Sequence, residues 1–400
     1  MSRVMISAMS VVSPIGTGRD EFFSGIERTV SGTGVITCFR ADFFPVALGA
    51  EARMGGTVIA AEEGTDRREL FNDIALDELF HCPSLDRYAP EERMLMAGCG
   101  VDFFRLANYA ESKDLERHCW QRYSNNSCLM FARHAQQFKI SGGTIVNASA
   151  CVASSQAIGC AFRMLSKGDR KGIIAGGVDS MLNPLHYMGF YKLGALSDWK
   201  GDPERSCRPF DRDRCGVVLG EGAAYYVLEN EAYAKQSEAL AWITGYSSTI
   251  DSYLITDPEP GGRFLALAAL EAIAQSGITP DQIDCVHAHG TGTLKNDIAE
   301  CNAMKQIFGG RYREVPVFSL KAQVGHLIGA CGALELGAVL YSFEKQVVPA
   351  TCNFETTDPA VDLCVLKTPL KKSINYILKL NAAFGGQNTA LVLQKANCNG

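Results

Sequence analysis

Residues 143–168, GTIVNASACVASSQAIGCAFRMLSKG, decide the fold expected for this chain. The first part of this stretch is a β-type run, and after Cys151 apolar residues recur at helical spacing on or near one face. Gly168 can end that helix, because glycine readily adopts the left-handed conformation found at helix C-termini. The stretch therefore predicts a strand, a turn that displays Cys151, and a helix.

Cys151 has two interpretations at this turn. Free backbone N–H groups and the positive end of the helix dipole favour a thiolate, which is the nucleophilic form of cysteine. The small neighbours Ala148, Ala150 and Ala153 leave room for a substrate. A buried, inert thiol is nevertheless the usual role of cysteine, and this chain has fifteen cysteines. A nucleophile therefore needs partners elsewhere in the sequence.

The whole chain alternates glycine-punctuated apolar runs with helical patterns, which predicts α/β layers. Strands are expected within 3–12, 93–104, 143–150, 171–181, 222–230, 241–249, 284–290, 315–320 and 389–395, and helices within 152–169, 263–277, 297–309 and 327–345. The last helix is dense in Gly and Ala, which suits burial. Because 400 residues exceed one core, two halves are expected, 1–245 and 246–400, divided after a charged segment, 229–245, that we expect to be helical.

Two segments of the second half place histidines at equivalent positions. DCVHAHGTGT, residues 284–293, leads a strand into a Gly/Thr turn at His289, and VPVFSLKAQVGHLIGA, residues 315–330, places His326 at the start of a helix. Histidine is the usual acid or base at neutral pH, and a helix N-terminus favours its neutral form. The alternative for each is a satisfied core histidine. His287 lies two residues before His289 on the same strand face, but this pair lacks a carboxylate or cysteine partner at ligand spacing in the sequence, so no metal site is expected.

Glycine-rich segments give two further candidates. NAAFGGQN, residues 381–388, contains the pair Gly385–Gly386, which permits positive φ angles in a loop over an active site or in an ordinary turn. VLGEGAA, residues 218–224, resembles a phosphate-binding loop only superficially. It lacks the G-K-[ST] ending of such a loop, so nucleotide binding at this segment is not expected.

Composition narrows the function classes. A net charge of −6 argues against a nucleic-acid surface, and no run approaches the ~20 apolar residues that span a bilayer. The cysteines are scattered without a C-x-x-C pair, which argues against a disulfide framework and zinc knuckles. The N-terminal apolar run alternates and breaks at Pro14, which favours a strand over a signal peptide. A cytoplasmic location is expected.

Taken together, these segments resemble the elongating β-ketoacyl-[acyl-carrier-protein] synthases, condensing enzymes of fatty-acid and polyketide synthesis. Their motifs occur in the family's order at 149–181, 189–197, 207–229, 287–297, 319–335 and 381–388, within a resemblance that covers most of 140–395. It implies an α/β thiolase-like fold with two similar halves layered αβαβα. It also implies an acyltransferase that joins malonyl-carrier protein to an acyl chain by decarboxylative Claisen condensation.

The resemblance assigns roles residue by residue. Cys151 matches the nucleophile that holds the acyl chain, and His289 and His326 match the pair that binds the malonyl thioester and promotes its decarboxylation. Further matches are the supporting residues Lys321 and Glu335, the gating aromatic Phe384 and its loop glycines Gly385 and Gly386, and an oxyanion hole made by the backbone N–H groups of Cys151 and Phe384. The chemistry implies no cofactor, because the acyl groups arrive on the phosphopantetheine of an acyl carrier protein.

Related classes differ at these positions. Thiolases use a second cysteine as base, and initiating synthases have Asn in place of His326. Chain-length factors usually lack the nucleophile, so a non-catalytic partner subunit is the alternative to an active synthase. The resemblance also implies a dimer, either with itself or with such a related subunit.

Departures from the family pattern point to specialised metabolism. The gating segment has Ala382 and Ala383 where many relatives have Phe and Gly, which favours a wider channel and a polyketide or polyene product. The stretch 100–140 is expected to form a lobe beside the channel or a dimer contact. Carrier-protein docking needs basic residues, for which the candidates are Arg311 and Arg313, or Lys167, Arg170 and Lys171, although each set also suits a solvated charged face.

Overall fold

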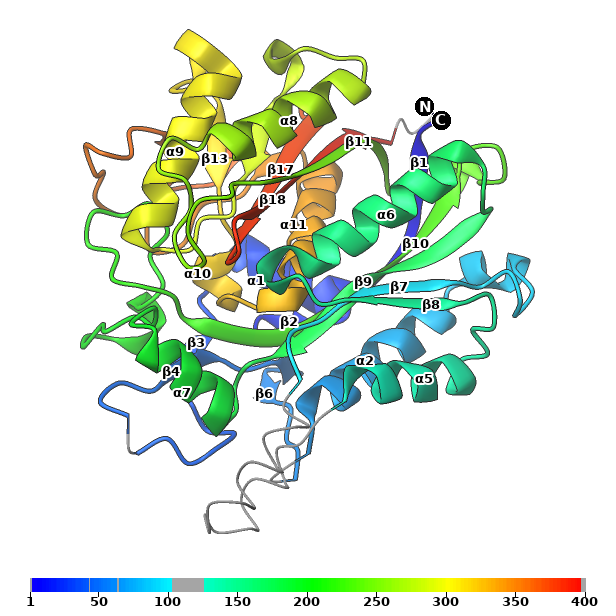
Figure 1. The fold of residues 1–400 in the computed structure, drawn as a ribbon, viewed down its shortest axis with the longest axis horizontal. Helices are drawn as coiled ribbons and strands as arrows, with labels where there is room; N and C mark the ends of the chain where they lie inside the picture. Colours follow the sequence, from blue (N-terminus) through cyan, green and yellow to red (C-terminus); the bar gives the residue numbers. More distant parts are fainter. Residues whose placement is uncertain (1, 43, 63–64, 103–125, 397–400) are drawn as a thin grey trace.

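The computed structural model describes residues 2–42, 44–62, 65–102 and 126–396 (Figure 1). Most of the stretch for which a lobe or dimer contact is expected, 103–125, lies outside the described residues.

Two groups of five strands form the centre of the molecule, and they share one strand order. In the first half the order is β8-β7-β9-β10-β1, and in the second it is β13-β12-β17-β18-β11. Numbered within each half, both orders are 3-2-4-5-1, with the first three strands of each order parallel and the remaining pairs antiparallel. The strands are β1 (Val4–Ser13), β7 (Leu95–Gly98), β8 (Thr144–Asn147), β9 (Gly172–Ser180), β10 (Leu219–Asn230), β11 (Ala241–Ile250), β12 (Cys285–His287), β13 (Pro316–Phe318), β17 (Tyr376–Ala383) and β18 (Gln387–Lys395).

The two groups join into one sheet where β1 pairs with β11, and helices cover their outer faces and lie between them (Figure 1). Two central helices, α6 (Ala153–Lys167) and α11 (Cys331–Lys345), contact strands of both halves. On the outer faces, α2 (Arg67–Phe80) and α5 (Ser127–Gln137) pack on the first half, whereas α8 (Arg263–Gln275) packs on the second and carries α9 (Leu294–Phe308). The expected αβαβα layering is therefore present.

Shorter elements complete the fold. They are α1 (Arg19–Arg28), α7 (Pro184–Lys192), α10 (Lys321–Val324), β2 (Gly16–Thr17), β3 (Thr33–Val35), β4 (Leu48–Ala50), β5 (Arg53–Met54), β6 (Thr57–Val58), β14 (Val347–Val348), β15 (Cys364–Val365) and β16 (Leu370–Lys371). No helix within the described ranges is both long and apolar enough to cross a membrane.

The two central helices pack closely because their facing residues are small. Every residue of α11 from Cys331 to Phe343 is buried, as its Gly/Ala content predicts. A Cβ atom at Gly332 would lie 2.0 Å from Ser155 Oγ of α6, so no larger residue fits there without movement. Gly168 ends α6 in the left-handed conformation at φ 83°, which confirms the expected helix end.

Two expectations about secondary structure are wrong. The charged segment 229–245 is not a helix: β10 continues to Asn230, a 3-10 turn spans Gln236–Glu238, and β11 begins at Ala241. The strand β17 was absent from the expected set, since Lys379 and Asn381 interrupt its apolar run although both side chains are buried.

Candidate active site

Cys151 lies between strand β8 and helix α6, as the sequence predicts. It belongs to a single 3-10 turn, Ala150–Val152, and Ala150 has a left-handed φ of 51°. This conformation is strained for a residue with a Cβ atom, and strain of this kind is common at functional sites. Cys151 is 4% exposed and lines a pocket of about 550 Å³.

The thiol of Cys151 is protonated at neutral pH. Burial raises the pKa of Cys151 to about 12, although the charge of Lys321 and the backbone N–H groups of Phe384 and of Cys151 itself act to lower it. Removal from water therefore outweighs the helix N-terminus that the sequence analysis expected to favour the thiolate.

His289 and His326 line the same pocket as Cys151. Their ring centroids are 5.3 Å apart, and the ring planes meet at 83°. His326 Nδ1 accepts the backbone N–H of Ile328 at 3.2 Å and lies 2.9 Å from Cys331 Sγ. Because a backbone N–H can only donate, the ring proton of neutral His326 is on Nε2.

His289 has the same tautomer for a different reason. Its Nδ1 lies 3.2 Å from Lys321 Nζ and 3.2 Å from the side-chain nitrogen of Asn381, both of which are donors. Lys321 Nζ also donates to the His289 backbone carbonyl at 2.6 Å. Nδ1 therefore accepts, and Nε2 carries the proton. The backbone N–H of His289 is held by Glu300.

Both histidines are neutral at neutral pH, as expected. Burial, and secondly the charge of Lys321, lower the pKa of His326 to about 3, and the same two causes hold the pKa of His289 well below its usual value. Each ring therefore has one N–H to donate.

Lys321 and Glu335 form a fully buried ion pair behind the histidines. Burial acts to lower the pKa of Lys321, but the charge of Glu335 outweighs it and raises this pKa above its usual range. Burial likewise acts to raise the pKa of Glu335, but the charges of Lys321 and Lys379 hold it well below its usual value. The pair is therefore ionised.

Two buried residues of β17 join this network, and the sequence analysis missed both. Lys379 Nζ lies 3.2 Å from Glu335 Oε2 and donates to the side-chain oxygen of Asn381. Asn381 Nδ2 donates to Glu335 Oε2 at 2.7 Å. The available signal was a lysine within the apolar run YILKLNAA, where an exposed position is improbable.

Three residues, Phe384, Gly385 and Gly386, connect β17 to β18, and Phe384 lines the pocket. The Phe384 ring stacks on Phe190 with centroids 6.3 Å apart and planes 26° apart. Gly385 has φ 83° and Gly386 φ 77°, and the Gly385 N–H donates to the Ile255 carbonyl at 2.7 Å. The glycine pair thus has the positive φ angles that the sequence analysis expected of a loop.

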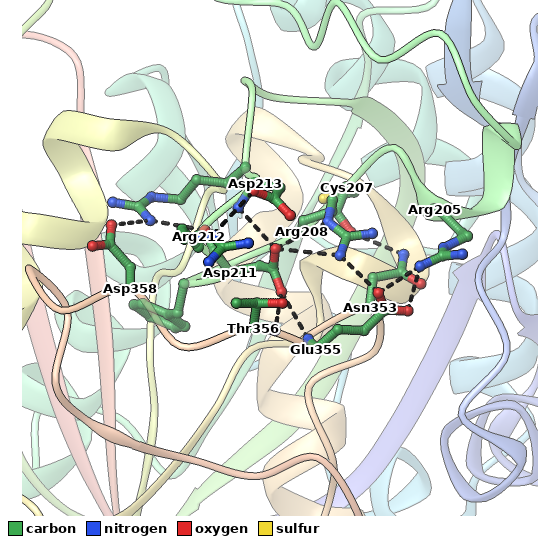
Figure 2. Close-up of polar contacts among 12 residues, drawn as sticks. Arg205, Cys207, Arg208, Asp211, Arg212, Asp213, Asn353, Glu355, Thr356 and Asp358 are labelled. Carbon is green, nitrogen blue, oxygen red and sulfur yellow. Dashed lines mark hydrogen bonds and ion pairs between the residues drawn. The ribbon is translucent and has the colours of Figure 1, made fainter.

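A polar cluster fixes another wall of the pocket. Figure 2 shows Asp211 accepting the backbone N–H groups of Glu355 at 2.7 Å and Thr356 at 2.8 Å, while Arg208 contacts both Asp211 and Glu355. These contacts hold Asp211 in place, three residues before the pocket-lining residues Arg214, Cys215 and Gly216.

The expected docking residues do not line the pocket. Arg311 pairs with Asp281, and Arg313 pairs with Asp362. In the other set, Lys171 pairs with Glu92. The lysine that does line the pocket is Lys295, which is paired with Asp257 at 2.6 Å.

Comparison with known proteins assigns the family. A model of the β-ketoacyl synthase N-terminal domain matches residues 65–234, and one of the C-terminal domain matches residues 240–355. The 3-oxoacyl-[acyl-carrier-protein] synthase 2 of Synechocystis sp. is 31% identical over 98% of this chain and 98% of its own length. The chain belongs to the β-ketoacyl synthase family.

Its relatives in this family act in both fatty-acid and polyketide synthesis. The tetracenomycin polyketide synthase ketoacyl synthase alpha subunit of Streptomyces glaucescens is 30% identical over 98% of this chain and 97% of its own. The present chain is therefore a β-ketoacyl-acyl-carrier-protein synthase, a condensing acyltransferase of fatty-acid or polyketide biosynthesis.

Solved structures confirm the thiolase-like fold. A type II polyketide synthase acyl-carrier protein in complex with its ketosynthase bound to the hexaketide matches with a TM-score of 0.84 and 26% identity, covering 99% of this chain and 100% of that one. The ishigamide ketosynthase/chain length factor matches with a TM-score of 0.85 and 24% identity, covering 98% of this chain and 99% of that one, a likeness of fold alone.

Proposed function

We propose that Cys151 holds the growing acyl chain as a thioester. Its sulfur attacks the carbonyl of an acyl thioester on a carrier protein, the carrier thiol leaves with the proton, and the acyl group stays on Cys151. The backbone N–H groups of Cys151 and Phe384 stabilise the tetrahedral oxyanion of this step. Because the free thiol has its pKa raised to about 12, proton transfer to the leaving thiolate accompanies the attack.

His289 and His326 serve the second half-reaction. Their Nε2–H groups donate to the thioester oxygen of malonyl-carrier protein, where negative charge develops as the bond to the carboxylate breaks and carbon dioxide leaves. The enolate carbon then attacks the carbonyl on Cys151, a carbon–carbon bond forms, and the Cys151 sulfur leaves. The observation that carries this proposal is that one nucleophile and two oriented N–H donors line a single pocket.

Lys321 and Glu335 support the histidines, and Phe384, Gly385 and Gly386 gate the pocket. Lys321 fixes the His289 tautomer, and Glu335 holds Lys321 in place. Opening the pocket requires the Phe384 ring to leave Phe190, and the adjoining glycine pair permits the necessary change in φ.

The partners proposed are an acyl carrier protein and a second subunit, identical or related to a chain-length factor. The crystallised complex of a related ketosynthase with its acyl-carrier protein supports the first. The second is supported by β8, which lies at the end of the described sheet and carries the 48% exposed Ile145. A sedimentation mass of one chain for the purified protein would contradict the dimer.

The cellular and domain assignments are proposals of the same kind. The thirteen cysteines that the structure describes are all free thiols, which suits a reducing cytoplasm. The shared strand order supports a division into halves at 1–245 and 246–400. Ala382 and Ala383 line the pocket, which supports a wider channel and a polyketide or polyene product.

The His326→Ala variant tests the division of roles. We expect it to lose malonyl decarboxylation by about 10²-fold or more, because one oriented donor to the developing oxyanion is removed. Acylation of Cys151, followed by intact mass with an octanoyl N-acetylcysteamine thioester, should persist. Loss of acylation with intact decarboxylation would contradict the proposal.

A further inference from the structure

Asn381 connects elements from both halves of the catalytic network. Its side-chain nitrogen faces Glu335 Oε2 at 2.7 Å and His289 Nδ1 at 3.2 Å. Its side-chain oxygen accepts the hydroxyl of Ser155 at 2.7 Å, from helix α6, and the ammonium of Lys379. All four of these neighbours are buried, and Asn381 is 1% exposed.

The neighbours leave the Asn381 amide one orientation. Ionised Glu335 can only accept hydrogen bonds, so it must face the NH₂ group. Lys379 faces the opposite side as a donor, so it must face the oxygen. Turning the amide by 180° would set two acceptors against each other at Glu335 and two donors at Lys379.

This orientation determines what His289 can do. With the NH₂ group fixed beside Nδ1, the imidazole receives hydrogen bonds there from both Asn381 and Lys321. The ring proton is then confined to Nε2, and His289 lines the pocket. Ser155 extends the same set of contacts to α6, the helix that begins beside Cys151.

Lys379 also changes the charge behind His289. Glu335 contacts two ammonium groups, Lys321 and Lys379, so these three side chains carry one excess positive charge. Burial lowers the pKa of Lys379 below its usual value although the charge of Glu335 opposes it, and the contact with this carboxylate favours the ammonium form. The excess charge discourages protonation of His289 and favours negative charge in the pocket. The other titratable groups around His289 are His287, Glu300, His326, Cys331 and Cys151.

We propose that Lys379 and Asn381 are positioning residues for decarboxylation, which act together to hold the proton of His289 on Nε2. The inference rests on the role proposed above for His289. Neither side chain is among those that line the pocket, so they act through the imidazole and not on the substrate.

The decisive variant is Asn381→Asp, which is nearly isosteric. It replaces the NH₂ group that faces both His289 Nδ1 and Glu335 Oε2 by an acceptor. A ring proton on Nδ1 then meets a carboxylate oxygen, which favours this form over the one in which Nδ1 accepts from Lys321. The ¹⁵N spectrum of histidine-labelled full-length protein, with the His289 signals assigned from a His289→Ala spectrum, should change from the Nε2–H form to an Nδ1–H or doubly protonated form.

Activity provides a second measurement. Decarboxylation of a malonyl N-acetylcysteamine thioester should fall at least about tenfold in Asn381→Asp and in Lys379→Met, since a misdirected donor no longer meets the oxyanion. Acylation of Cys151 by an octanoyl N-acetylcysteamine thioester should stay within about twofold. Lys372→Met is the matched control, because it removes a half-buried lysine that contacts Asp284 outside this network. We expect its decarboxylation rate to be unchanged.

The outcomes separate the inference from the proposed function. The inference would be overturned if Asn381→Asp kept the Nε2–H spectrum and decarboxylated within about twofold of the wild-type rate. If Lys379→Met does not fold, the result for Asn381→Asp decides alone. Normal decarboxylation by His289→Ala would instead overturn the role of His289 in the proposed function. An altered spectrum together with loss of decarboxylation supports the inference.

Discussion

His287 is a buried histidine that the proposed mechanism does not use. It is fully buried, and neither ring nitrogen has a hydrogen-bond partner among the described residues. Its ring packs edge-on against Phe318 with centroids 4.7 Å apart. Burial, opposed by the charge of Glu335, lowers the pKa of His287 to about 3. His287 is therefore a neutral packing residue whose polar atoms lower stability.

The His287→Leu variant should stabilise the protein most at acidic pH. In the unfolded chain, histidine binds a proton below about pH 6.5, whereas folded His287 does not until about pH 3. Between these values wild-type stability therefore decreases as pH falls, and the variant lacks this loss. The gain should be roughly 2 kcal/mol larger at pH 5 than at pH 7.5, measured by urea unfolding.

The exposed histidine His81 offers a matched control for this prediction. His81→Leu removes an exposed ring at the C-terminal end of α2, and it is the control for replacing a histidine by leucine outside the core. An equal change for His287→Leu at both pH values would contradict the assignment of His287 as a buried neutral group.

The residues proposed to react are easier to find in the sequence than the residues that contact them. Cys151 and His289 each follow a strand, and His326 lies between the short α10 and the 3-10 turn before α11. Local patterns make these residues candidates, and the order of the family's motifs selects them. Lys379 and Asn381 acquire their roles from Glu335, which is more than forty residues away in sequence. Pattern analysis assigns no partner at such a separation, because the contact arises only when β17 packs against α11.

Two central helices help to bring the proposed catalytic residues into one pocket. The N-terminus of α6 follows Cys151, and that of α11 follows His326 through a 3-10 turn at Ile328–Ala330. The backbone N–H of Ala333 donates to Ser154 Oγ at 3.0 Å, which joins the helix ends. The separation of nucleophile and histidine therefore depends on how closely these helices approach.

Gly332→Ala should force the two helices apart. The added Cβ would lie 2.0 Å from Ser155 Oγ, and overpacking of this kind costs about 1–3 kcal/mol. We expect a lower melting temperature and a condensation rate that falls further than global stability explains. Gly189→Ala in α7 is the control, because a Cβ there meets nothing within 4 Å. Equal melting temperatures for the two variants would contradict this packing account.

Elements with a strong apolar periodicity are predicted well from the sequence. Segments that mix charged and apolar residues without such a periodicity are not. The helices α8 and α9 match their apolar patterns to within a few residues. The charged segment before β11 has a helical composition but forms only a short 3-10 turn, because β10 and β11 extend toward each other and leave few residues between them. Tertiary packing, and not local propensity, sets that boundary.

The two halves of the molecule contribute to the pocket through equivalent elements. In each half a central helix follows the third strand: α6 follows β8, and α11 follows β13 through the short α10. The first junction contributes Cys151, and the second contributes Lys321 and His326. The two halves share the order and direction of their strands but not their amino-acid sequence. The strand orders therefore agree although the sequence shows no tandem repeat.

The central claim is that Cys151 carries the acyl chain that malonyl then extends. Intact-mass and peptide analysis after treatment with an octanoyl N-acetylcysteamine thioester tests it most directly. The account predicts one octanoyl group on Cys151, absent from Cys151→Ala, that is discharged as a β-ketoacyl product when a malonyl thioester is added. An octanoyl group on Cys215, the other thiol that lines the pocket, or condensation by Cys151→Ala at the wild-type rate, would contradict it.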